Sequence, residues 1–365
     1  MSKSILILKR DFTALGGAEK YGRRLAHALY RRGDKVTLLT SGPMTDTPPF
    51  EVISMPHCPK TSLQTLICFD QFAKYYQQKL KPDAILGLDR NRFQTHLRAS
   101  SGVHRSYLQH RKQIEPHWKS LRHRINPLHR LLLQMEKSGF EHPKLKTLFT
   151  NSNLVKHEIL KHYNVDEKKI EVIHNGVEWE QWQVPFDDWP TVYSGHRFEF
   201  LFVGNNFERK GLFRLLRGLA LLPTKEFHLS VVGRDKHLAK FKSHAKQLGL
   251  KSNVTFHGAQ QNVTPFYQKA DALVIPSYYD PFANVTVEAL AMGLFVVSSK
   301  TNGGCEVLTP ETGTCIEDLS SDEAIAESLS IALKYPKTEE SADTIRQKTQ
   351  YLDFSTQLGH YLERI

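Results

Sequence analysis

The sequence predicts an α/β protein built from two parallel-sheet domains. Its 365 residues exceed what one ordinary core requires. Short apolar runs alternate with stretches of helical periodicity in both halves, which is the pattern of parallel strands joined by helices. The alternation stops at residues 183–195, which hold two prolines and no periodicity, and then starts again. We therefore expect a linker there, domains at 1–183 and 184–343, and a last helix at 344–365 that stays with the second domain or crosses back onto the first.

The first domain is expected to open with a strand, a helix and a second strand. Tyr21, Leu25 and Leu29 recur at four-residue spacing, which places them on one face of the helix. Gly33 then suits the left-handed residue that ends a helix. Two strands joined by a helix run parallel, so a parallel sheet follows. The expected strands are 5–8, 36–39, 84–88, 148–149 and 170–173, and the expected helices are 18–32 and 153–163.

The second domain repeats this alternation. Open parallel sheets bind ligands at the carboxyl ends of their strands. Two such domains therefore predict a cleft between their sheets, and polar residues that follow strands are the first candidates for a site. The expected strands of this domain are 198–203, 227–232, 254–256, 272–275 and 295–298.

The composition indicates a basic protein with an anionic partner. The chain carries 49 Lys and Arg against 38 Asp and Glu, a formal charge of +11, which favours phosphate, nucleic acid or an anionic membrane as partner. The apolar run near the start is too short for a secretion signal, and no stretch is long enough to span a membrane. The four cysteines form no C-x-x-C pair, which argues against a zinc site and for a reducing compartment. We expect a cytoplasmic protein.

Arg209 and Lys210 stand between a predicted strand and a predicted helix. Breaking the bond between a sugar and a nucleotide leaves a diphosphate that gains negative charge, and two adjacent cations can stabilise that charge. The Arg fork and the Lys point charge both suit phosphate. The alternative is a solvated pair of cations at the start of a helix, since exposed cations are common.

Asp280 and Glu288 are eight residues apart, the first in the loop after a predicted strand and the second near the first turn of a predicted helix. Backbone N–H groups at such a helix start can bind phosphate. Glu288 could accept hydrogen bonds from ribose hydroxyls, and Asp280 from sugar hydroxyls. Alternatively, Asp280 forms a turn and Glu288 is a favourable charge near a helix N-terminus. A third segment, Gly16–Gly17, follows the first strand, where glycine lets the backbone approach a diphosphate.

In their order and spacing, these segments resemble the family 4 retaining glycosyltransferases of the GT-B fold, in which two Rossmann-like domains face each other across a cleft. The resemblance covers nearly the whole chain. It implies that Arg209 and Lys210 hold the diphosphate of a nucleotide-sugar donor, that Glu288 binds the ribose, and that Asp280 binds the transferred sugar. It also implies that the phosphates are held by backbone groups of Gly17, Phe282, Ala283, Asn284 and Val285.

The resemblance further implies that the reaction retains the anomeric configuration and that the leaving phosphate takes the acceptor proton. It implies no protein nucleophile, no metal and no cofactor besides the nucleotide-sugar co-substrate. The family usually has Glu at position 280 and glycines near 281 and 283, where this chain has Asp280, Pro281 and Ala283. These departures concern sugar recognition more than the chemistry.

Residues 104–146 form a basic insertion in the first domain, with ten Lys and Arg, three Glu and six His. Residues 98–105 are similar to a stretch in bacterial lipopolysaccharide-core glucosyltransferases, which implies that Ser101 or His104 faces the transferred sugar. The same resemblance implies that the insertion docks on anionic lipid headgroups, which makes the protein peripheral on the inner face of the cytoplasmic membrane. A phosphorylated lipid-linked saccharide is then the acceptor, and UDP-glucose the default donor. The alternatives are a surface role for His104 and a solvated helical hairpin for the insertion.

Two rival functions stay open. One is the same enzyme class acting on capsule, O-antigen or a glycolipid. The other is a non-catalytic basic protein that binds nucleic acid or a membrane. That protein would explain the charge at 104–146, but not why Arg209, Lys210 and Asp280 follow strands of the second domain. Glu288 would also repel nucleic-acid phosphate, so we expect no nucleic-acid partner.

Overall fold

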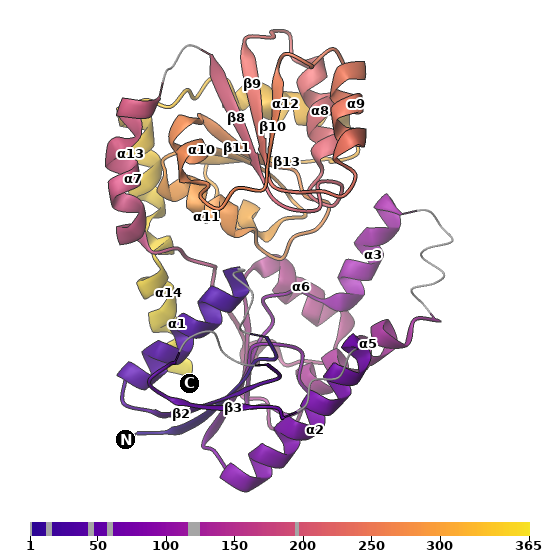
Figure 1. Cartoon of the computed structure of the whole chain (residues 1–365), viewed down its shortest axis with the longest axis vertical. Helices are drawn as coiled ribbons and strands as arrows, with labels where there is room; N and C mark the ends of the chain where they lie inside the picture. The colour runs from indigo at the N-terminus through magenta and orange to yellow at the C-terminus, as the bar shows by residue number, and fades with distance from the viewer. Residues whose placement is uncertain (1, 12–16, 43–46, 57–60, 116–124, 194–196) are drawn as a thin grey trace. The chain divides into compact units, whose positions relative to one another are not determined.

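The computed structural model describes residues 2–11, 17–42, 47–56, 61–115, 125–193 and 197–365. The chain divides into two compact units, Met1–His174 with Leu358–Ile365, and Asn175–Gln357. Each unit is built on one parallel sheet with helices around it (Figure 1). The predicted fold class, two Rossmann-like α/β domains, is confirmed.

The first unit contains a seven-stranded sheet in the order β3-β2-β1-β4-β5-β6-β7. Ile5 to Leu8 of β1 are all buried, because helices cover both faces of a parallel sheet and every strand position needs an apolar side chain. The chain moves outward in one direction from β1 to β3 and in the other from β4 to β7, so the order reverses between β1 and β4. The strands are β1 Ser4–Leu8, β2 Lys35–Thr40, β3 Glu51–Ser54, β4 Ala84–Gly87, β5 His96–Arg98, β6 Thr147–Thr150 and β7 Ile170–Val172.

The described part of the basic insertion is mostly helical, and its last residues, 141–146, form turns and loop. Helices α3 and α5 pack against each other, while residues 116–124 of the predicted insertion lie outside the described residues. The described helices of this unit are α1 Gly17–Arg31, α2 Ser62–Leu80, α3 His104–Ile114, α5 Pro127–Phe140, α6 Asn153–His162 and the short η1 Glu167–Lys169. Strands β3 and β5 and helix α2 were not expected from the sequence.

The second unit contains a six-stranded parallel sheet in the order β10-β9-β8-β11-β12-β13, which reverses between β8 and β11. Its apolar residues form the largest core cluster, centred on strands such as Phe200–Val203 and Ala272–Ile275. Four of the five strands expected here agree within one residue, β10 runs two residues further, and β13 was not expected. The strands are β8 Phe198–Val203, β9 Phe227–Val232, β10 Val254–Gly258, β11 Ala272–Ile275, β12 Phe295–Ser299 and β13 Gly313–Ile316.

The helices of the second unit form two groups, one on each side of the sheet (Figure 1). The first group is α8 Leu212–Leu221, α9 Leu238–Gln247 and α12 Asp322–Ala332. The second group is α7 Trp179–Val192, α10 Thr264–Lys269, α11 Asn284–Ala291 and α13 Glu339–Thr349. Two short 3-10 helices, η2 Gly303–Val307 and η3 Gln350–Leu352, complete the unit.

The expected linker at 183–195 is wrong, because α7 occupies most of it. Trp179, Phe186 and Trp189 are buried in the core of the second unit. The guanidinium of Arg346 lies 4.6 Å from the centre of the Phe186 ring and donates to the Trp179 carbonyl. Burial of these aromatic rings outweighs the helix hydrogen bonds that two internal prolines remove. The units therefore divide after His174 rather than near residue 183.

The expected last helix at 344–365 is two helices, α13 and α14 Phe354–Arg364, separated by η3. Residues Leu358–Ile365 belong to the first unit. There the Tyr361 ring packs against Tyr21 and Phe149, and Arg98 Nε donates to its hydroxyl over 3.0 Å. The two ends of the chain also meet, since Lys3 Nζ donates to the Ile365 carbonyl over 2.8 Å.

Cys305 in η2 and Cys315 in β13 lie side by side, with their Cα atoms 5.9 Å apart, a spacing that a disulfide allows. The two cysteines are ten residues apart in the sequence and so do not have C-x-x-C spacing. The reducing compartment stays a prediction. Among the residues that the structure describes, Cys68 is a free thiol, and no helix there is long and apolar enough to cross a membrane.

Candidate active site

The strongest candidate site lies where the strand order of the second sheet reverses. Arg209 and Lys210 follow β8, and Asp280 follows β11, which are the two strands on either side of the reversal. At such a point the connections leave in opposite directions and open a crevice at the carboxyl ends of the strands. The fold thus brings together the cations and one of the carboxylates that the sequence singled out.

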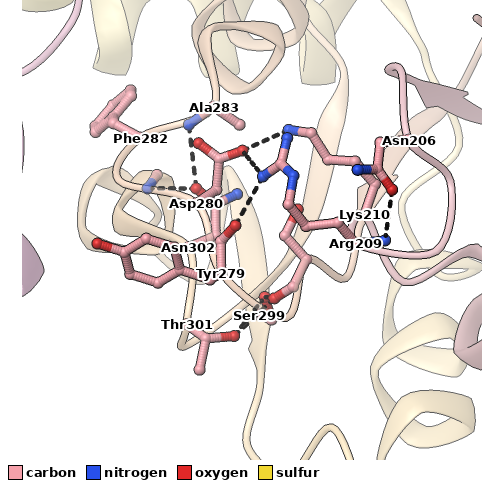
Figure 2. A network of polar contacts seen from close by, with 12 residues as sticks. Asn206, Arg209, Lys210, Tyr279, Asp280, Phe282, Ala283, Ser299, Thr301 and Asn302 are labelled. Carbon is pink, nitrogen blue, oxygen red and sulfur yellow. Dashed lines mark hydrogen bonds and ion pairs between the residues drawn. The ribbon is translucent and has the colours of Figure 1, made fainter. Parts of the chain in front are cut away.

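Asp280 contacts both cations directly (Figure 2). Its Oδ2 lies 2.6 Å from Lys210 Nζ and 3.3 Å from a terminal nitrogen of Arg209. Burial alone would raise the pKa of Asp280, but the charges of Lys210 and Arg209 outweigh burial and hold the pKa below its usual range. The carboxylate therefore stays ionised, and it keeps both cations fixed at the edge of the sheet.

The two loops that carry this cluster are joined by one backbone hydrogen bond and one from a side chain to the backbone. The Tyr278 N–H donates to the Arg209 carbonyl over 3.0 Å, and the Arg209 guanidinium donates to the Tyr279 carbonyl over 2.8 Å. Gly211 follows the cations with a φ of +79°, and a Cβ there would lie 1.8 Å from the Pro276 carbonyl oxygen. Only glycine permits this approach, so its position after the two cations is a structural requirement.

Asn302 organises the other side of Asp280, and the sequence reasoning did not identify it. Its buried amide oxygen accepts from the N–H groups of Ala283 and Gly304, each over 3.1 Å. Its amide nitrogen donates to Ser298 Oγ over 2.9 Å. The backbone of Asp280 is fixed beside Asn302. The Asp280 N–H donates to the Thr301 carbonyl, and the Asp280 carbonyl accepts from the Gly303 N–H, over 3.0 Å each. An Asn-Gly-Gly run that begins three residues after a buried strand was the available signal.

Helix α11 begins beside this cluster, as the sequence predicted. Ala283 is its N-cap and provides no side-chain cap bond. Asn284 is the first helical residue, and its Oδ1 accepts a hydrogen bond from Asn175 Nδ2 over 2.7 Å. Phe282 and Ala283 are buried, while Asn284 and Val285 are half-buried. The first N–H groups of such a helix are suited to an anion, and phosphate binding by residues 282–285 stays a prediction.

Glu288 lies in the second turn of α11, one turn later than expected. It accepts a bond from the hydroxyl of buried Tyr267 over 2.7 Å. Burial, followed by the charge of Glu288, raises the pKa of Tyr267 well above its usual value, so the phenol remains a donor. This bond orients one carboxylate oxygen. Binding of ribose hydroxyls by Glu288 stays a prediction.

His104, the remaining predicted site residue, belongs to the first unit and begins α3. It is not a plain surface residue, because its side chain is buried and its Nε2 lies 3.0 Å from Nδ1 of His129. Its backbone N–H donates over 2.7 Å to Glu136, a fully buried carboxylate that also accepts from Tyr163. Ser101 is exposed nearby. Contact of either residue with a sugar stays a prediction, and so does the role of Gly17, the first residue of α1.

Among the described residues, no group of three or more His, Cys, Asp or Glu is arranged to hold a metal ion. In the candidate site, Arg209 and Lys210 supply positive charge, and metal independence stays a prediction.

The two parallel-sheet units, and the paired cations beside a helix start, agree with the GT-B fold. Residues 15–181 match the family described as Glycosyltransferase Family 4, and residues 186–350 match Glycosyl transferases group 1. These two matches together span nearly the whole chain, which belongs to the family 4 glycosyltransferases of the GT-B fold.

The chain is similar to enzymes of bacterial surface polysaccharides. It is 28% identical over 226 residues to the lipopolysaccharide glucosyltransferase WaaG of Escherichia coli K12. The aligned stretch covers 59% of this chain and 60% of that protein. It is 31% identical over 182 residues to the O-antigen chain mannosyltransferase RfbU of Salmonella typhimurium, covering 49% of this chain and 48% of that one. The chain thus matches between about half and three fifths of the length of these relatives.

Solved structures agree with the fold over the whole chain. The crystal structure of WaaG superposes with a TM-score of 0.77 over 98% of both chains, at 22% identity. The structure of Anabaena Alr3699/HepE in complex with UDP-glucose superposes with a TM-score of 0.68 over 100% of both chains, at 16% identity.

Proposed function

We propose that the protein is a retaining, metal-independent glycosyltransferase. It moves a hexose, with glucose as the default, from a nucleoside-diphosphate sugar, with UDP as the default, to a lipopolysaccharide-core or other lipid-linked saccharide. The observation that carries this proposal is the cluster of Arg209, Lys210 and Asp280 at the reversal point of the second sheet. Membership of the family and the likeness to WaaG support the same reaction class.

In this reaction, the bond between the anomeric carbon and the donor phosphate oxygen breaks. A new bond forms from that carbon to an acceptor hydroxyl oxygen, and the hydroxyl proton passes to the leaving phosphate. The nucleoside diphosphate therefore gains a negative charge as the bond breaks. Lys210 and Arg209, already oriented by Asp280 before the donor binds, stabilise that charge without rearranging. Asp280 then accepts bonds from hydroxyls of the transferred sugar, and Glu288 accepts bonds from the ribose.

The charge of the first unit supports an anionic acceptor. This unit holds 31 Lys and Arg against 16 Asp and Glu, a formal charge of +15, while the second unit holds 18 against 22, a charge of −4. The first sheet has its own cluster where its strand order reverses, since Lys9 Nζ lies 2.9 Å from Asp89 Oδ1 and Arg10 follows Lys9 directly. A phosphorylated saccharide would be attracted to this unit.

The basic insertion supports docking on an anionic membrane. Arg105, Lys112, Arg130 and Lys144 are exposed on or beside α3 and α5. Ile125, just before α5, is 72% exposed and could enter the headgroup region. This arrangement of cations beside an apolar side chain supports a peripheral location on the inner face of the cytoplasmic membrane.

Radiolabelled UDP-glucose, GDP-mannose and UDP-galactose, each supplied with truncated lipopolysaccharide, test the proposal. We expect one donor to label the lipid fraction equally with and without EDTA, and the anomeric proton of the product to match the configuration of the donor by NMR. Capsule fragments, O-antigen precursors and a glycolipid serve as the other acceptor arms. The function is wrong if no donor labels any acceptor, and the metal independence is wrong if EDTA abolishes labelling.

A further inference from the structure

The cations of the candidate site are partly neutralised before any donor arrives. Arg209 and Lys210 both contact Asp280, so two positive charges and one negative charge leave a net charge of +1 in the cluster. A nucleoside diphosphate carries about −3 near neutral pH, because the second ionisation of a phosphate lies near pH 6. One further cation at the same edge of the sheet would bring the positive charge of the site closer to the negative charge of the diphosphate.

Arg234 lies at that edge. It follows β9 by two residues, and β9 pairs in parallel with β8, with Val232 opposite Val203. The carboxyl ends of these neighbouring strands therefore carry both the Arg209–Lys210 loop and Arg234.

The backbone of Arg234 is bonded to the loop that carries the cations. Its N–H donates to Asn205 Oδ1 over 3.0 Å, and its carbonyl accepts from Asn206 N over 3.3 Å. Asn206 Oδ1 in turn accepts from the Arg209 N–H over 3.3 Å. Gly233 has a φ of +131°, and a Cβ there would lie 1.9 Å from the Gly204 carbonyl oxygen, so no side chain fits between the two loops.

The side chain of Arg234 contrasts with those of two other charged residues that follow strands of this sheet, Asp235 and Lys300. Asp235 accepts bonds from two backbone N–H groups, and Lys300 after β12 pairs with Glu317. The Arg234 guanidinium is exposed and, within the described part of the chain, makes no hydrogen bond or ion pair. A guanidinium on a fixed backbone can donate two parallel bonds to phosphate oxygens.

We propose that Arg234 is a third cation of the donor site and that its guanidinium binds phosphate oxygens of the nucleoside diphosphate. This inference rests on the proposed function, and it assigns a role to a residue outside the Arg209–Lys210 pair. Arg234 adds a unit of positive charge that is not paired with a carboxylate of the described residues.

Calorimetric titration of the full-length protein with UDP, and in parallel with GDP and ADP, tests the inference. We expect Arg234→Ala to weaken binding of the preferred diphosphate about ten- to hundredfold, the range of one charge-assisted contact. Arg234→Lys should recover part of the loss. Lys240→Ala, an exposed cation on α9 with the same change of charge, should bind within about twofold of the unchanged protein.

The outcomes distinguish a failure of the proposed function from a failure of the inference about Arg234. If the unchanged protein binds none of the three diphosphates, the proposed function fails and the inference fails with it. If the unchanged protein binds but Arg234→Ala binds equally well, or loses no more than Lys240→Ala, only the inference is overturned. A circular dichroism melt of each variant establishes folding, and a variant whose loss of binding is accompanied by unfolding is replaced by Arg234→Gln under the same criteria.

Discussion

Lys210 is the residue whose removal should most directly affect catalysis. Its ammonium is nearly buried and lies 2.6 Å from Asp280. We expect Lys210→Ala to lower kcat by a factor of tens or more, because a fixed charge opposite the leaving diphosphate acts mainly in the transition state. Arg209 still pairs with Asp280 in this variant, so the fold should persist.

Steady-state kinetics with the identified donor checks this expectation. Lys251→Ala is the matched control, because Lys251 is an exposed cation that precedes β10, at the opposite edge of the same sheet. Normal turnover in the Lys210 variant would contradict the assignment of the site.

The buried residue Lys337, which is not part of the candidate site, should make the stability of the protein depend on pH. Its ammonium is buried, lies 4.4 Å from the centre of the Trp189 ring and donates to the Tyr267 carbonyl. Burial lowers the pKa of Lys337 to about 7, although Asp271 opposes the shift. Between pH 7 and the ordinary lysine range the unfolded chain holds a proton that the folded chain lacks, so this group makes the free energy of unfolding rise with pH.

We expect the difference in unfolding free energy between the unchanged protein and Lys337→Met to grow by roughly 1–4 kcal/mol from pH 7 to pH 10, at about 1.4 kcal/mol per pKa unit. Urea unfolding at a series of pH values measures it. A difference that stays constant, or that falls with pH, would show that the buried lysine keeps its proton.

The loop between β8 and α8 depends on glycine geometry. Gly211 combines a φ of +79° with a Cβ position 1.8 Å from the Pro276 carbonyl. Gly249 has a similar φ of +74°, but a Cβ there would meet nothing within 4 Å. Gly249→Ala should therefore cost about 1 kcal/mol of stability from the backbone conformation alone. Gly211→Ala should cost at least about 2 kcal/mol more, because it also forces the two site loops apart.

Chemical denaturation of the two glycine variants measures this difference, and the donor affinity of Gly211→Ala should fall as well. Equal destabilisation of both variants would mean that the contact with Pro276 is relaxed in solution.

Helices α3 and α5 are the elements that should contact the membrane. We expect neutralising Arg105, Lys112, Arg130 and Lys144 together to weaken binding to vesicles of anionic lipid by roughly 1 kcal/mol per residue near the surface. Binding of the donor should be unchanged, since these residues are in the first unit, whereas Arg209, Lys210 and Asp280 are in the second.

Vesicle sedimentation at low and physiological salt is the measurement. The control neutralises four exposed cations of the second unit, Lys240, Lys242, Lys246 and Lys251. If the control loses as much binding, net charge rather than the basic insertion controls membrane association.

At the scale of the whole chain, the last eight residues belong to the first unit, although they follow the second unit in the sequence. Tyr361 is fully buried there, and Arg98 lies 3.8 Å from the centre of the Tyr21 ring beside it. We expect Tyr361→Ala to destabilise the protein by about 3–5 kcal/mol, the usual cost of truncating a buried aromatic ring. Tyr75→Ala, which removes a 56% exposed ring from α2 of the same unit, should change stability little.

Thermal and urea unfolding compare these two variants. A Tyr361→Ala protein as stable as the unchanged one would mean that the C-terminal segment contributes little to the first unit.

The local pattern of the sequence determined the fold class and most of the second sheet. Strand 272–275 is apolar throughout, and strand 198–203 is apolar except for Glu199, because both faces of a parallel sheet are covered; burial of these strands is therefore recognisable from consecutive apolar residues. Arg209, Lys210 and Asp280 were identifiable for a related reason, since each stands where a recognisable strand has just ended.

Only the tertiary structure decided the features that depend on residues distant along the chain. The prolines of α7 indicate a linker locally, and burial of Trp179, Phe186 and Trp189 overrides them. The role of Asn302 exists because β12 places it beside the loop after β11. The partial neutralisation of Arg209 and Lys210 by Asp280 likewise appears only when two strands meet at the reversal point of the sheet. Sequence records periodicity and spacing, whereas contact between distant segments is set by packing, and the charge balance of the site depends on that contact.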